Sequence, residues 1–269
     1  MEFFESHCHL ADDKYALVLD EIINNAKREN VKKIITIGCS IIEAEKSLQI
    51  AKTYNEYVYS TAGLYPHDNE SEQYQKLSTN ERLKIIESML ITNPEIKAVG
   101  ECGLDYKEAP PHEKARSKEE QIDLFQNQIQ IAKHTKKPLI IHSRMATADT
   151  LKIIKETKFE NFVWHCFSED LETAKAVINA NGKLSFTGLI TYKKFAFLKE
   201  VIEFVPDTNL LIETDGPYLI PESLKKSKPT FSEPWHVRII AQEIATIKRI
   251  SLEQVADFTT KNAINFFGI

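Results

Sequence analysis

The strongest restriction on the fold comes from eight short apolar runs, rich in β-branched residues, that alternate along the chain with helical patterns. They cover residues 2–7, 33–38, 57–62, 96–101, 138–142, 161–165, 183–187 and 209–213. Such runs are typical of strands buried on both faces of a parallel sheet. Strands that alternate with helices predict an α/β fold, either a closed barrel or an open, doubly wound sheet.

The segments between these runs carry helix signals. Three of them begin with a capping box, in which a serine and a Glu or Gln three residues later satisfy each other's backbone donors. The pairs are Ser78 with Glu81, Ser117 with Glu120, and Ser251 with Gln254. After Ser117, the apolar residues Ile122, Phe125 and Ile129 predict one buried helical face.

The nucleotide-binding versions of the open sheet lose support, because no GxGxxG or GxxxxGK[ST] motif follows any of the runs. No internal repeat or linker-like stretch divides the 269 residues, and this length suits one barrel domain. We therefore expect a single (β/α)₈ TIM barrel over residues 1–269. The Pro-rich segments near Pro110 and from Pro217 to Pro234 are expected to be loops.

The charge and the cysteines limit the possible partners. The chain has 34 Lys and Arg against 39 Asp and Glu, a net charge of -5, whereas proteins that grip long nucleic-acid backbones are usually basic. We expect contact with only a few phosphates, which favours single strands or ends. The start lacks a signal-peptide pattern, no apolar run is long enough for a bilayer, and the four cysteines are widely spaced. These features predict a cytoplasmic protein with reduced thiols, no membrane contact and no obligate protein partner.

Polar residues with metal-binding chemistry stand at the ends of several predicted strands. The set is His7, His9, Glu101, His142, His165 and Asp215. In a barrel these strand ends lie at one face, which is where barrel enzymes place their active sites. Because alternate strand residues point the same way, His7 and His9 can face one ion together while Cys8 points elsewhere.

Each of these residues alone is a weak signal, since a histidine at a strand end can be a satisfied core residue. Together they would carry a large desolvation cost without a shared partner, and metal coordination supplies one. Four imidazoles and two carboxylates suit two ions bridged by a carboxylate, roughly 3.5–4 Å apart. The competing interpretation is a buried salt-bridge cluster. Because neighbouring residues of a strand point to opposite sides, Cys102 and Cys166 are not expected to be ligands beside Glu101 and His165. We expect both to be small buried hydrophobic residues outside the site.

Two further residues open onto the same face. His67 follows the third predicted strand and is either a substrate contact or a turn residue. Arg144 comes two residues after His142 and offers a planar fork for phosphate oxygens, although it could instead pair with a nearby carboxylate. The remaining histidines, His112, His134 and His236, are expected at the surface.

At these residues the chain resembles the TatD-like metal-dependent deoxyribonucleases. The matching stretches are Ser6 to Leu10, Ala98 to Tyr106, Pro138 to Arg144, His165 to Ser168, Ser185 to Gly188, Leu211 to Tyr218, and Asn262-Ala263 with Phe266-Phe267. They cover essentially the whole chain in the right order. The resemblance implies an amidohydrolase-type (β/α)₈ barrel that hydrolyses phosphodiesters in DNA.

The resemblance also implies roles for the individual residues. His7, His9 and Asp215 would bind the first metal, Glu101 would bridge both ions, and the histidines of the fifth and sixth strands, His142 and His165, would bind the second. The chain departs from the family at Tyr65, where the family commonly has His, and at Ser232, where the family has Asn. Tyr65 is therefore also a candidate substrate-binding residue.

Three classes of function follow. The first is a two-metal phosphodiesterase acting on DNA ends or single strands, with Glu101 and Asp215 as catalytic residues and Asp215 as ligand, proton acceptor or both. The second is a hydrolase of another ester or amide, such as an aminoacyl-tRNA ester or a small cyclic amide. The third is a binding protein without catalysis, which an intact ligand set disfavours. The donor set is compatible with Zn, Mn, Fe or Ni, and with Mg in a carboxylate-rich half.

Overall fold

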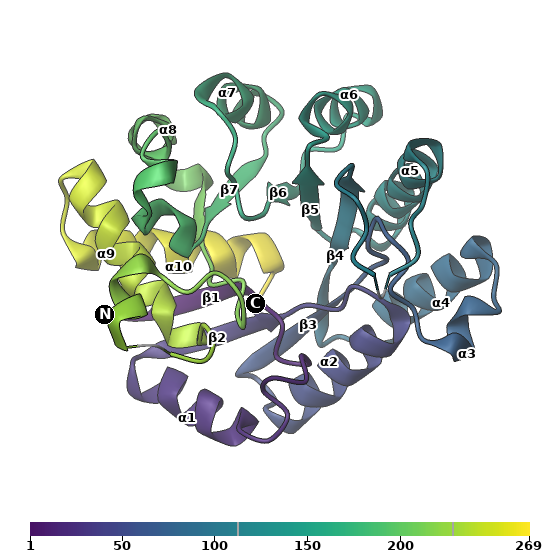
Figure 1. The fold of residues 1–269 in the computed structure, drawn as a ribbon, viewed down its shortest axis with the longest axis horizontal. Helices are drawn as coiled ribbons and strands as arrows, with labels where there is room; N and C mark the ends of the chain where they lie inside the picture. The colour runs from purple at the N-terminus through teal and green to yellow at the C-terminus, as the bar shows by residue number, and fades with distance from the viewer. Residues whose placement is uncertain (112, 228) are drawn as a thin grey trace.

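The computed structural model describes residues 1–111, 113–227 and 229–269. Eight parallel strands follow one another in chain order around a barrel, and helices lie outside them (Figure 1). The strands are β1 (Phe3–Cys8), β2 (Val31–Thr36), β3 (Val58–Ala62), β4 (Ile96–Asp105), β5 (Leu139–Arg144), β6 (Phe162–Trp164), β7 (Lys183–Phe186) and β8 (Leu210–Ile212). The predicted (β/α)₈ barrel is confirmed, and all eight predicted strands are present within a few residues.

The described α-helices connect the strands and cover the outside of the barrel. They are α1 (Leu19–Arg28), α2 (Ile41–Thr53), α3 (Glu72–Gln75), α4 (Thr79–Thr92), α5 (Lys118–Thr135), α6 (Thr147–Thr157), α7 (Leu171–Asn179), α8 (Leu198–Phe204), α9 (Val237–Lys248) and α10 (Leu252–Phe267). The three predicted capping boxes start α4, α5 and α10. Within the described ranges, no helix combines the length and apolar character needed to cross a membrane.

The barrel closes where β1 meets β8, and polar side chains form much of this seam. Ser6 Oγ donates to the carbonyl of Ile212 at 2.9 Å. The buried carboxylate of Glu5 accepts from the backbone N–H of Thr214 at 3.0 Å. Just beyond β8, the backbone N–H of Asp215 donates to the carbonyl of His7 at 2.9 Å. The seam therefore places the end of β1 against the segment that carries Asp215.

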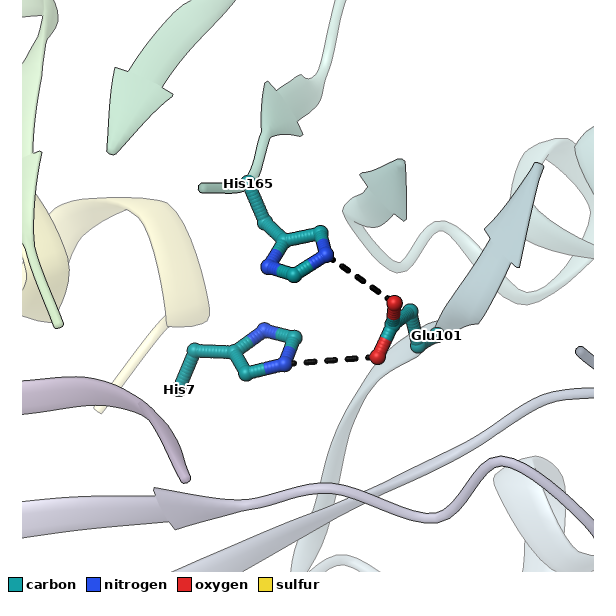
Figure 2. A group of neighbouring side chains, drawn as sticks. All are labelled: His7, Glu101 and His165. Carbon is teal, nitrogen blue, oxygen red and sulfur yellow. Dashed lines mark ion pairs between the residues drawn. The ribbon is translucent and has the colours of Figure 1, made fainter. Parts of the chain in front are cut away.

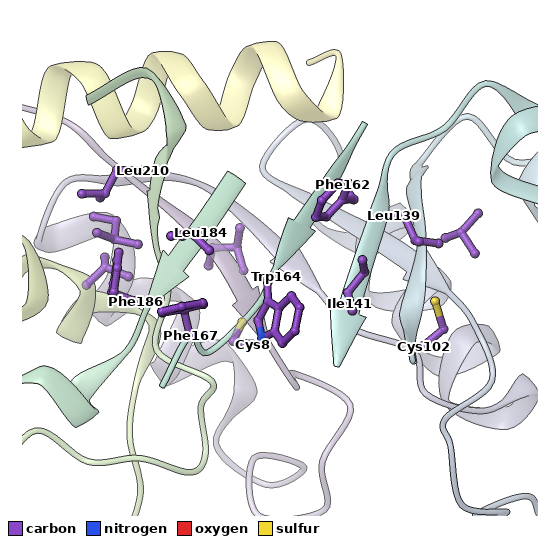
Figure 3. Close-up of a cluster of buried hydrophobic side chains, with 14 of the residues drawn as sticks. Cys8, Cys102, Leu139, Ile141, Phe162, Trp164, Phe167, Leu184, Phe186 and Leu210 are labelled. Atoms are coloured by element: carbon purple, nitrogen blue, oxygen red, sulfur yellow. The ribbon is translucent and has the colours of Figure 1, made fainter. Parts of the chain in front are cut away.

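Strand alternation divides the core into two apolar clusters. The larger one lies between strands and helices and includes Trp164, Phe186 and the sulfur of Cys102 (Figure 3). The smaller one contains Phe4, Ile140 and Leu211 from the strands together with side chains of α10. The ring of Phe267 in α10 stacks on that of Phe4, with centroids 5.9 Å apart. With one end of the strands packed in this way, the other end remains for polar chemistry.

Close approach of β4 and β5 depends on glycine. A Cβ at Gly103, whose φ is 144°, would lie 2.0 Å from the carbonyl oxygen of His142, so only glycine permits this contact. Pairing with β5 extends β4 to Asp105, four residues beyond the predicted end at Glu101. The extension brings Asp105 to the same end of the barrel as His142.

Candidate metal centre

The six candidate ligands meet at the carboxyl end of the barrel. His7 lies in β1 with His9 just beyond it, Glu101 lies in β4, and His142 lies in β5; the other two, His165 and Asp215, follow β6 and β8. The side chains of His7 and Glu101 are 1% and 4% exposed. The sequence predicted this convergence from strand ends alone, and the structure brings all six residues together.

Glu101 stands between two groups of histidines and directs one oxygen to each group. Its Oε1 lies 2.7 Å from Nδ1 of His142 and 2.9 Å from Nε2 of His165. Its Oε2 lies 3.4 Å from Nε2 of His7 and 3.9 Å from Nε2 of His9. Figure 2 shows this carboxylate beside the rings of His7 and His165, with one oxygen directed to each ring. A carboxylate with its two oxygens divided in this way can bridge two cations.

Asp215 completes the group around His7 and His9. Its Oδ1 lies 3.3 Å from Nε2 of His9 and 3.6 Å from Nε2 of His7. Potential ligand atoms of these three residues all lie within 4.8 Å of one another, and the same holds for His7, Glu101 and His165. His7 belongs to both groups.

The surroundings of His7 fit a metal ion better than a closed salt-bridge cluster. The His7 ring is buried, and neither of its nitrogens has a hydrogen-bond partner among the described residues. It also stacks on the His165 ring, with centroids 4.1 Å apart. Buried polar atoms without partners are costly, and imidazole with carboxylate is a donor set suited to Zn, Mn, Fe or Ni.

The charges of the centre reinforce one another. Burial alone would raise the pKa of Glu101, but the neighbouring His165 and His142 hold it well below its usual range. The pKa of Asp215 is likewise lowered, against burial, by its contact with His9. Although burial opposes it, the Asp215 carboxylate raises the pKa of His9 to about 9. The two carboxylates are therefore anionic at neutral pH, and His9 is protonated when no cation is bound.

Two carboxylates that sequence reasoning missed lie next to the outer nitrogens of two candidate ligand histidines. Asp105 Oδ2 lies 3.2 Å from Nε2 of His142, and Glu213 Oε1 lies 3.4 Å from Nδ1 of His165. Such partners fix the tautomer and orientation of a metal-binding imidazole. Alternation along β4 could have found Asp105, which stands four residues after Glu101, whereas Glu213 lies beyond the end of β8, where alternation gives no signal.

A cavity of about 810 Å³ opens over the centre. Its lining includes His9, Glu101, His142, His165, Asp215, Tyr65, Arg144, Leu189, Phe195 and Tyr218. Arg144 is exposed at its edge. The Tyr65 hydroxyl lies 3.1 Å from both Asp105 Oδ2 and His142 Nε2.

His67 lies elsewhere. It is buried, its Nε2 lies 3.0 Å from the carbonyl of Lys107, and it is not part of the cavity lining. This placement supports the turn alternative, in which His67 joins two loops.

Two predictions from the sequence are wrong. Cys166 is not a small buried hydrophobe outside the site, because it is partly exposed and lines the cavity. Its φ of 47° breaks the alternation, and β6 already ends at Trp164. His236 is not a surface residue; it is 2% exposed, because the segment Pro234–His236 packs against β1, β2 and α1. Its Nδ1 accepts from the backbone N–H of Glu233 at 3.1 Å.

Other predictions hold or stay open. Cys8 and Cys102 are buried in the larger apolar cluster, as strand alternation predicted. His134 is exposed on α5. The prediction for His112 falls outside the described residues.

Comparison with known proteins gives a consistent result over the whole chain. The family model described as TatD related DNase matches residues 4–268. An uncharacterized metal-dependent hydrolase, YabD of Bacillus subtilis, is 34% identical over 268 residues, which is 99% of both chains. The human deoxyribonuclease TATDN3 is 30% identical over 98% of this chain and 93% of its own. The solved structure of YJJV, a TatD homolog from Escherichia coli, superposes with a TM-score of 0.87 at 24% identity over 99% of this chain and 98% of its own.

Proposed function

Because the chain belongs to the TatD-related DNase family of metal-dependent hydrolases, we propose that it is a two-metal phosphodiesterase acting on DNA ends or single strands. The observation that carries this proposal is the division of the Glu101 oxygens between two groups of ligands. His7, His9 and Asp215 would hold one cation, and His142 and His165 the other. Residues 1–269 would act as one domain.

The reaction class follows from charge. Divalent cations at this position would neutralise phosphoryl oxygens and lower the pKa of water toward neutrality. The low pKa of Asp215 keeps its carboxylate ionised and able to orient a water or accept its proton. Arg144 at the cavity edge would hold a phosphate that does not react.

The name of the human relative supports DNA as the substrate. That protein is a deoxyribonuclease, and it aligns with almost the whole of this chain. The cavity, at about 810 Å³, has room for a nucleotide next to the candidate ligands. The alternative substrate is another ester or amide, and assays on DNA and on p-nitrophenyl carboxylate esters distinguish the two classes.

The test uses metal-depleted protein reconstituted separately with Zn, Mn, Mg, Fe and Ni. We expect about two ions per chain and hydrolysis of labelled single-stranded DNA. Glu101→Ala should abolish turnover while circular dichroism shows a folded protein. Full activity of Glu101→Ala, or protein that retains no metal, would refute the two-metal site. Turnover of p-nitrophenyl carboxylate esters without any nuclease activity would assign the protein to the second class.

A further inference from the structure

Positive charge is concentrated on one side of the cavity mouth although the chain as a whole is acidic. The segments 188–195, after β7, and 216–227, after β8, contain four lysines against one glutamate. The lysines are Lys193, Lys194, Lys225 and Lys226, all exposed. Within the described parts of the chain, none of them forms an ion pair with a carboxylate. We call these two segments the basic rim.

The two segments of the rim form one surface. The hydroxyl of Tyr192 donates to the carbonyl of Ile220 at 2.5 Å. The backbone N–H of Glu222 donates to Thr191 Oγ1 at 2.8 Å, and Lys225 Nζ lies 4.6 Å from the centre of the Tyr192 ring. In Figure 1 the two segments of the basic rim are the green and yellow-green stretches that lie between β7 and α9 along the chain. The four lysines therefore share a continuous edge.

Aromatic rings connect this edge to the candidate metal centre. Tyr218 is 45% exposed, and its ring meets that of His9 edge-on, with centroids 5.8 Å apart. Phe195 lines the cavity, its ring centre lies 4.8 Å from Lys194 Nζ, and it is 6.2 Å from the Phe197 ring. Phe197 is 47% exposed. Exposed rings next to lysines are the combination that binds single-stranded nucleic acid, by base stacking and phosphate attraction.

Elsewhere the lining of the cavity carries the carboxylates Glu43 and Glu113. A polyanion leaving the cavity would be repelled there and attracted at the basic rim. The uneven distribution of charge thus favours the rim as the exit for an extended strand.

We propose that the basic rim binds the single-stranded nucleic acid that extends from the candidate metal centre, with bases stacked on Tyr218, Phe195 and Phe197 and phosphates on the four lysines. This rests on the proposed phosphodiesterase function and adds the path of the strand. The enzyme then contacts more phosphates than the net charge of -5 led us to expect. Long single strands would be preferred over dinucleotides.

The test compares the rim variant, with all four lysines changed to Glu, with a control in which Lys84, Lys152, Lys155 and Lys261 on α4, α6 and α10 are changed to Glu. Each metal-loaded protein is assayed on bis(p-nitrophenyl) phosphate and on a 12-nucleotide single strand at low and high salt. We expect the rim variant to lose at least about 10-fold in kcat/KM on the oligonucleotide at low salt, with a smaller loss at high salt. Its activity on the small diester should stay within about two-fold of wild type, which also shows that it is folded.

A second pair of variants tests stacking. Phe197→Ala should weaken oligonucleotide binding about 10-fold, whereas Phe204→Ala, an exposed phenylalanine on α8, should not. Binding is measured by fluorescence anisotropy of a labelled oligonucleotide and needs no turnover. Equal losses in rim and control variants, or no loss in either, would overturn the proposed path. If wild-type protein binds the oligonucleotide through the rim but does not cleave it, the proposed phosphodiesterase function is refuted and the proposed path is not. A wild-type protein that binds no oligonucleotide would refute the path.

Discussion

The hydroxyl of Tyr65 lies 3.1 Å from Nε2 of His142, while the other ring nitrogen of His142 faces Glu101 at 2.7 Å. The same hydroxyl lies 3.1 Å from Asp105 Oδ2. Tyr65, one of the two departures from the expected family pattern, therefore belongs to the support of a candidate ligand. It orients His142 so that Nδ1 remains available for a cation.

Removing the hydroxyl tests this support. Tyr65→Phe should weaken binding of the second cation about 10-fold, because outer partners of metal-binding histidines typically contribute 10- to 100-fold in affinity. Competition with a chromophoric chelator measures the affinity. Tyr59→Phe, on β3, is the matched control and should leave it unchanged. An affinity equal to wild type in Tyr65→Phe would mean that Asp105 alone orients the ring.

Cation binding should release protons. The pKa of His9 is raised to about 9 by Asp215 against the effect of burial, so at pH 7.5 metal-free protein carries a proton that must leave before the nitrogen can bind a cation. Apparent affinity should therefore rise as pH increases toward 9, by about a factor of ten per pH unit for each proton released. Calorimetric titrations in buffers of different ionisation enthalpy count these protons. His9→Gln should release fewer, and an unchanged count would contradict protonation of His9.

Arg144 should affect the reaction without affecting the cations. If its guanidinium binds a substrate phosphate, Arg144→Ala should reduce transition-state stabilisation on a phosphodiester by about 2 kcal/mol. Metal content should not change, because the candidate ligands are other residues. Steady-state kinetics and elemental analysis on the same preparation measure both quantities. Arg238→Ala, on α9 with a surface ion pair to Glu29, serves as control. The same kcat/KM in Arg144→Ala and wild type would assign Arg144 a structural role.

His236 should make the fold sensitive to acid. Burial lowers its pKa from 6.5 to about 4, so the unfolded chain binds a proton between these values and the folded chain does not. Its contribution to stability is complete above pH 6.5 and is lost as pH falls toward 4, by about 3 kcal/mol. Denaturant unfolding of wild type, His236→Gln and the exposed control His134→Gln, at pH 7 and pH 4.5, measures this. Equal acid sensitivity of wild type and His236→Gln would refute the assignment.

Local pattern, together with the family resemblance, was enough to predict the barrel and the candidate ligands at its carboxyl end. Apolar runs followed by His, Glu or Asp located the strands to within a few residues, and serine capping boxes located three helix starts, because these signals depend on neighbours within a few residues. The six candidate ligands could be identified together because parallel strands deliver their carboxyl ends to one face.

What local pattern could not supply was the partner of each side chain. The division of the Glu101 oxygens, the support of His142 by Tyr65, the burial of His236 and the joining of two lysine-bearing loops into one rim all depend on residues far apart in the chain. Hydrogen bonds and charges act over a few ångströms in space, whatever the separation in sequence. Strand alternation indicates the direction of a side chain only while the strand continues, and at Cys166 the left-handed backbone ended it.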